Sequence, residues 1–263
     1  MTSDPLAMDL REAIGRGGDL HLAYLPELSF ATGRVVGMDA LARWTHPAMG
    51  PIPPSRFVPL ALEIGLLATL TEWVLKTAFR QCRVWRDDGH ELDVSVNLSP
   101  ANLRDDRLPR LVMVQGRALD VRPGWMHLEI PESVIRSADD EVATLAAALR
   151  AEGAFLVADS VDPTLEAEAA PRVRVDAIKL QQALVRRVGE PPVAHALLAT
   201  IERARAGGVL VIAQGIEDRA TYEALAALGC DRAQGFFISR PLAPLELATW
   251  LRDPRPLVPG GDR

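Results

Sequence analysis

The stretch Leu20–Trp44, LHLAYLPELSFATGRVVGMDALARW, decides how the chain folds. It contains two apolar runs, 20–28 and 35–44, with six residues between them. Six residues are enough for a hairpin connection, but they are too few for the helical crossover that parallel strands require. The sequence therefore predicts that the first two strands are antiparallel.

Downstream of this hairpin, short apolar runs alternate with amphipathic segments. The expected strands lie at 92–99, 126–130, 154–159, 175–180, 209–214 and 233–237. The expected helices lie at 56–88 with a break near Gly65, and at 101–118, 138–153, 192–208, 219–229 and 244–251. Together with the hairpin this makes eight strands, which favours an α/β fold, a TIM-like (β/α)8 barrel whose first strand is antiparallel.

The chain is expected to form a single domain over residues 1–253. Leu6, Leu10 and Ile14 are spaced as on one face of a helix, so a lead-in helix is predicted at about 5–15. The last residues, 254–263, lack apolar periodicity and are predicted to be a disordered tail.

Composition excludes several classes of function. The 263 residues carry a formal net charge of −6, with acidic and basic residues interspersed, so no basic face is expected for a nucleic acid polymer or an anionic membrane. No signal peptide and no apolar run near 18 residues is found, and the two cysteines, Cys82 and Cys230, lie far apart. A cytoplasmic location is therefore expected.

Polar side chains gather at or near the ends of the predicted strands. Carboxyl ends of strands meet at one face of such a barrel, and chemistry is found there. The set is rich in oxygen, and hard divalent cations such as Mg²⁺, Mn²⁺ or Ca²⁺ prefer oxygen ligands. Each residue taken alone could instead cap a helix or anchor a turn. The members are Asp39, Asn97, Glu129, Asp159, Lys179, Gln214 and Gln234.

Six strings along the chain resemble the motifs of EAL-domain cyclic di-GMP phosphodiesterases, in the order and at the spacing of that family. Asp39-Ala40-Leu41 stands where the family has Glu-Ala-Leu. The resemblance covers about residues 20–251 and is carried by MDALARWTHPAMG, VSVNLSPANL, HLEIPES, DAIKL, VIAQGIED and GCDRAQGFFISRPL.

The resemblance implies a TIM-like barrel and hydrolysis of cyclic di-GMP to pGpG with two Mg²⁺ or Mn²⁺ ions. Position by position, Asn97 and Glu129 match metal ligands, and Asp39 stands where the family has Glu. Asp159, the remaining member of the family's aspartate pair, is a further candidate metal ligand or could cap a loop. Lys179 matches the lysine near the attacking water. The remaining matches are a carboxylate, a ligand-contacting arginine and a strand-end glutamine, namely Glu217, Arg43 and Gln234. Ligand binding is accordingly expected of Arg43, Asn97, Lys179 and Gln234.

The departures from the family fall where catalysis is expected. Ala158 replaces the first of two paired aspartates, which leaves the metal site incomplete, and Gln214 replaces the glutamate proposed as base. A neutral amide cannot accept a proton at physiological pH. Leu25 replaces a Gln that contacts the nucleotide in the family. The Asp39 side chain is shorter than the Glu that the family has at this position. Residues 160–170 replace the family's Gly-Thr-Gly loop.

These departures lead to the expectation of a degenerate, catalytically inactive EAL domain, in which Lys179 is vestigial and any cation is bound weakly. It would act in cyclic di-GMP-linked signalling as a nucleotide receptor or through an unidentified protein partner. The alternative is a weak or active metal-dependent phosphodiesterase. Family members often pair through the face that carries the paired-aspartate loop, and the altered loop argues against a dimer here.

Overall fold

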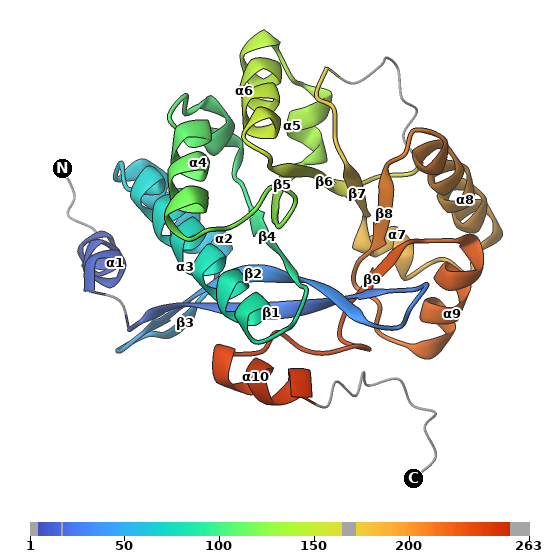
Figure 1. Cartoon of the computed structure of the whole chain (residues 1–263), viewed down its shortest axis with the longest axis horizontal. Coiled ribbons are helices and arrows are strands. Elements are labelled where there is room, and N and C mark those ends of the chain that lie inside the picture. The colour runs from blue at the N-terminus through green and yellow to red at the C-terminus, as the bar shows by residue number, and fades with distance from the viewer. Residues whose placement is uncertain (1–4, 17, 165–171, 253–263) are drawn as a thin grey trace.

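A computed structural model describes residues 5–16, 18–164 and 172–252 and contains a closed barrel of eight strands (Figure 1). Strand pairing runs β1-β9-β8-β7-β6-β5-β4-β2, and β1 pairs with β2 to close the ring. The barrel strands are β1 Leu20–Ser29, β2 Val35–His46, β4 Asp93–Asn97, β5 Met126–Pro131, β6 Phe155–Val161, β7 Ala177–Leu180, β8 Leu210–Ala213 and β9 Arg232–Gln234.

The first strand is antiparallel to both of its neighbours. Leu20 pairs with Trp44 across β1 and β2, and Glu27 pairs with Gln234 across β1 and β9. The other barrel pairings are parallel, as expected for strands joined by helical crossovers. The predicted barrel with an antiparallel first strand is confirmed.

Helices surround the barrel and follow the predicted order (Figure 1). The predicted break near Gly65, whose φ is +71°, separates two of them. Three short elements, β3 Gly50–Ile52, α5 Glu132–Arg136 and α7 Gln182–Val185, were not expected, because so few residues show no periodicity. The others are α1 Pro5–Arg16, α2 Pro54–Glu63, α3 Leu67–Asp87, the 3₁₀ helix Pro100–Arg104, α4 Leu108–Ala118, α6 Asp140–Ala151, α8 Pro191–Ala206, α9 Arg219–Leu228 and α10 Pro244–Arg252. The single helix expected at 101–118 is instead a short 3₁₀ helix followed by α4.

Alternation along the strands decides which side chains enter the barrel. Leu128, Ile130, Leu156 and Ala158 pack with the side chains of α3, α4 and α6, so they face outward. A separate small cluster, Val157 with Ala177 and Ile212, fills the interior. Since successive strand residues point to opposite faces, Glu129, Asp159 and Lys179 point inward.

Strand β6 carries a bulge at the position where the predicted strand stops. Ala158 pairs with Ile178 and Val161 pairs with Leu180, so β6 has one more residue than β7 in this interval. Ser160 adopts a left-handed conformation with φ +60°. The strand therefore continues past Asp159 to Val161, two residues further than predicted, because the bulge absorbs the irregular backbone.

The lead-in helix is confirmed as α1, and its apolar residues pack against Trp44 and Phe57. The predicted tail lies outside the described residues, as do residues 165–171 of the rebuilt loop. A single domain over 1–253 stays a prediction. Among the described residues, no helix combines the length and the apolar character needed to cross a membrane.

Candidate functional site

A buried lysine joins two carboxylates inside the barrel. Lys179 on β7 donates a hydrogen bond from Nζ to Oδ2 of Asp39 on β2, at 2.6 Å, and another to Oε1 of Glu129 on β5, also at 2.6 Å. Lys179 is fully buried, and both carboxylates are almost so. Three strands that are far apart in sequence thus converge on one ammonium group.

Asp39, Glu129 and Lys179 shift one another's pKa values, because their charges lie close together in a buried site. Burial alone would lower the pKa of Lys179, but the charges of Asp39 and Glu129 raise it above its ordinary value, so the ammonium stays charged. Burial would raise the pKa of Asp39, but Lys179 overrides this effect and holds it below its usual range. Burial and the charge of Asp39 raise the pKa of Glu129 well above its ordinary value. The ammonium therefore acts as the shared counter-ion of this site, with one hydrogen bond to each carboxylate.

Gln234 lies at the same end of the barrel interior and is also buried. Its side-chain amide donates to the backbone carbonyl of Leu25, at 3.5 Å. The following residue, Gly235, has φ +153°, and a Cβ there would lie 2.2 Å from the backbone oxygen of Ile216. Because only glycine permits this close approach, Gly235 fixes the position of Gln234. Oδ1 of Asp39 is buried and lacks a hydrogen-bond partner within the described part of the chain.

Asp159 and Gln214 form a second, more open contact. The Gln214 side-chain amide donates from Nε2 to Oδ1 of Asp159, at 3.0 Å, and both residues are partly exposed. Oδ2 of Asp159 accepts from the hydroxyl of Ser160 at 3.2 Å. The amide at position 214 thus satisfies the carboxylate by hydrogen bonding, where a second carboxylate would repel it.

The donor set does not fit a pair of divalent cations. Two dications need several carboxylates that share the ions. Here Lys179 supplies the positive charge between Asp39 and Glu129, and Ala158 contributes no ligand atom and faces outward. In the residues that the structure describes, no group of three His, Cys, Asp or Glu side chains could hold a metal ion.

Two predicted ligand-binding residues line a pocket beside this site. Arg43 and the exposed Asn97 border a cavity of about 330 Å³ with apolar walls from α2 and α3. Arg43 donates from Nη1 to the carbonyl of Ala42 at 3.0 Å, and burial lowers the pKa of its guanidinium. The pocket walls, Val58 and Val74 among them, could not be predicted from the sequence, because their spacing is that of ordinary core positions.

Glu217 does not join the cluster of Asp39, Glu129 and Lys179. It is exposed, and its carboxylate forms an ion pair with Arg186. The structure therefore brings together Asp39, Glu129 and Lys179, pairs Asp159 with Gln214, and leaves Glu217 at the surface.

Comparison with known proteins identifies the family. The EAL domain model matches residues 7–241. Cyclic di-GMP phosphodiesterase PA2567 of Pseudomonas aeruginosa is 32% identical over 249 residues, which cover 94% of this chain and 42% of that protein. Oxygen sensor protein DosP of Escherichia coli is 33% identical over 255 residues, which cover 96% of this chain and 32% of that protein. The chain belongs to the EAL domain family, and it spans less than half the length of these two relatives.

Solved structures agree with this assignment. The structure described as PaMucR phosphodiesterase in complex with c-di-GMP superposes with a TM-score of 0.83 and 30% identity, and covers 92% of this chain and 99% of that chain. The FimX EAL domain from Pseudomonas aeruginosa bound to c-di-GMP superposes with a TM-score of 0.80 at 20% identity, covering 92% of this chain and 97% of that chain, and so supports the fold alone.

Proposed function

We propose that this chain is a catalytically silent EAL domain that binds cyclic di-GMP as a receptor and passes the signal to a protein partner. The observation that carries the proposal is the Lys179 ammonium buried between Asp39 and Glu129. It gives the two carboxylates a counter-ion within the protein itself. The chain then keeps the fold of a cyclic di-GMP phosphodiesterase without a donor set for two metal ions.

Receptor function is supported by the pocket beside this trio. Its volume of about 330 Å³ would hold one part of the dinucleotide, and the rest of the ligand would lie outside the pocket. Arg43 supplies a guanidinium for a phosphate, and the exposed amide of Asn97 supplies a donor and an acceptor. PaMucR, at 30% identity over most of this chain, is described in complex with c-di-GMP, which favours the same ligand class here.

Calorimetry with cyclic di-GMP tests the receptor. We expect saturable binding that changes less than about threefold when Ca²⁺ is added, because the metal site is incomplete. Arg43→Gln is expected to weaken binding about tenfold, the equivalent of one charge-assisted hydrogen bond. Arg110→Gln is the matched control, because Arg110 is an exposed arginine of α4 outside the pocket.

Absence of heat with and without Ca²⁺ would rule out the receptor and leave regulation through a protein partner. Binding that requires Ca²⁺ would show that the strand-end carboxylates do assemble around a cation, which contradicts the role given to Lys179.

The competing function is a metal-dependent phosphodiesterase. It is favoured by the names of the relatives, among them PA2567 at 32% identity. It requires Asp39, Glu129 and Asp159 to release their present partners and assemble around metal ions. A measurement of cyclic di-GMP hydrolysis separates the two functions.

A further inference from the structure

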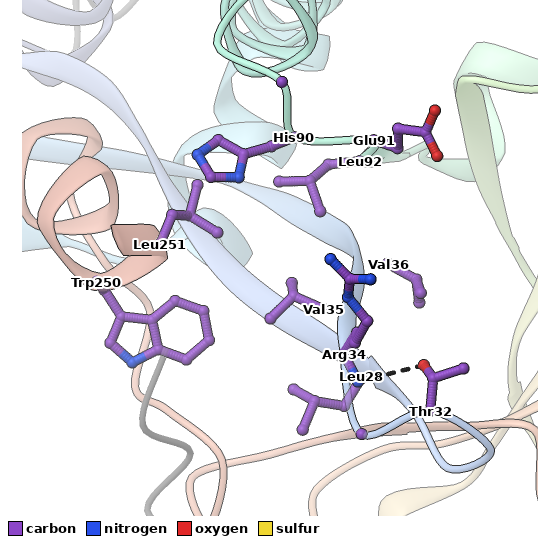
Figure 2. A pocket seen from close by; sticks show the side chains of 12 residues that line it. Leu28, Thr32, Arg34, Val35, Val36, His90, Glu91, Leu92, Trp250 and Leu251 are labelled. Carbon is purple, nitrogen blue, oxygen red and sulfur yellow. Dashed lines mark hydrogen bonds between the residues drawn. The ribbon is translucent and has the colours of Figure 1, made fainter. Parts of the chain in front are cut away.

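A second cavity, of about 710 Å³, lies at the end of the barrel opposite to the candidate site. Figure 2 shows the side chains that line it. Its walls include Val35, which begins β2, and Leu92, which directly precedes β4. Asn97, in contrast, ends β4 at the face of the candidate site. The cavity therefore belongs to the amino-terminal end of the strands, and it shares no lining residue with the pocket that contains Arg43.

Three segments far apart in the sequence enclose this cavity. They are the β1–β2 turn at 32–34, the α3–β4 loop at 89–91, and the last turn of α10 with Trp250 and Leu251. In Figure 2, Trp250 and Leu251 form one side, while Arg34 and Thr32 form the other. The volume falls within the range of sites that enclose small organic ligands.

A β-bulge lies in the cavity wall. Leu28 pairs with Val35 and Glu27 pairs with Gly37, so Val36 has no partner on β1. Bulges of this kind are common at barrel rims and beside binding sites, where they redirect neighbouring side chains. The turn that carries Arg34 is thus joined to the sheet through an irregular segment that is itself part of the wall.

The side chains of the cavity combine one free cation with apolar surface. The Arg34 guanidinium is exposed and forms no ion pair with any residue in the described ranges. Leu28, Val35 and Leu92 provide aliphatic walls. Glu91 also lines the cavity, with its carboxylate pointing away from Trp250 in Figure 2, and within the described ranges it forms no ion pair with Arg34.

These features of the cavity favour one chemical class of ligand. A guanidinium forms paired hydrogen bonds to a carboxylate or phosphate, and it remains charged at every physiological pH. The partly buried indole of Trp250 offers a flat aromatic face to a ring system. Aliphatic side chains between the two provide apolar contact for the ring. A ligand that uses all three is flat, aromatic at one end and anionic at the other.

We propose that this cavity is a binding site for a small planar aromatic anion, with its anionic group on Arg34 and its ring against Trp250. The site is independent of cyclic di-GMP, because it lies at the other end of the barrel. It gives the chain a second small-molecule input.

The test uses 2-naphthoate as probe and 2-naphthamide as its neutral counterpart, each titrated into the full chain while ¹H–¹⁵N TROSY spectra are recorded. The indole N–H signal of Trp250 is assigned by its loss in Trp250→Phe. We expect 2-naphthoate to produce saturable shifts of this signal and of the Gly33 and Gly89 amides. Binding of 2-naphthamide should be about tenfold weaker, the effect of losing one charge-assisted contact.

The variant Arg34→Gln should weaken 2-naphthoate binding about tenfold and leave 2-naphthamide binding unchanged, whereas the control Arg110→Gln should alter neither. Arg34 is exposed and unpaired in the described part of the chain, so this variant is expected to fold. The proposal is overturned if 2-naphthoate gives no saturable shift at Trp250 up to millimolar concentration, or if wild type and Arg34→Gln bind it equally.

Discussion

Lys179→Met lowers the free energy of unfolding by about 3–5 kcal/mol, which is the expected result of removing one partner from a buried ion pair. The side chain of Lys179 is fully buried, and its Nζ is bonded to two carboxylates at 2.6 Å each. Methionine fills much of the same volume but leaves Asp39 and Glu129 facing one another without a cation. Urea unfolding followed by circular dichroism at pH 7 measures the loss.

The other lysine in the sequence, Lys76 on α3, is exposed and supplies the matched control. Lys76→Met should change stability by no more than about 0.5 kcal/mol. If Lys179→Met does not fold, the double variant Lys179→Met with Glu129→Gln provides a second stability measurement, because it removes one of the two carboxylates left without a cation. It should recover part of the lost stability. A loss below about 1 kcal/mol for Lys179→Met would mean that the ammonium is not the counter-ion of this site.

Ala158→Asp, the substitution that rebuilds the paired aspartates of the family, is expected to cost about 3 kcal/mol or more of stability. Ala158 is 4% exposed and packs with the outward-facing core. It pairs with Ile130 on β5 and with Ile178 on β7, so a carboxylate there would enter an apolar layer between sheet and helices. Chemical unfolding gives the size of the effect.

Ala158→Ser is the matched control, and it should lose about 1 kcal/mol because a hydroxyl is less costly to bury than a charge. We expect Mn²⁺ at millimolar concentration to leave the melting temperature of Ala158→Asp unchanged. If Ala158→Asp were as stable as the wild type and further stabilised by Mn²⁺, the side chain at position 158 would reach the barrel interior, and the bulge in β6 would have to rearrange.

Much of the fold could be predicted from local sequence. The six residues between the first two apolar runs predict the antiparallel pair of β1 and β2, and the later alternation of strands and helices predicts the barrel. Both depend on spacing along the chain, which the sequence displays directly. The short elements β3, α5 and α7 span too few residues for a periodic signal, so only tertiary packing reveals them.

The residues of the candidate site could be predicted from the sequence, but the contacts between their side chains could not. Polar residues at strand ends indicated that Asp39, Glu129 and Lys179 converge. The sequence could not show that Lys179 would be the shared counter-ion, because this depends on side-chain directions in three strands. Nor could it show that Ala158 and Asp159 face opposite sides of β6, since this depends on strand register and on the bulge at Ser160. The cavity that contains Arg34 is formed by three segments that are far apart in the sequence. It could not be predicted, because no local sequence pattern indicates that these segments meet.

We expect this EAL domain not to hydrolyse cyclic di-GMP, and an assay of product formation decides between the two proposed functions. The purified chain is incubated with cyclic di-GMP and Mg²⁺ or Mn²⁺, and pGpG is quantified by chromatography. We expect fewer than about one turnover per hour, far below the rates of working enzymes. Metal-dependent pGpG formation that exceeds this rate and is abolished by Glu129→Gln would contradict it.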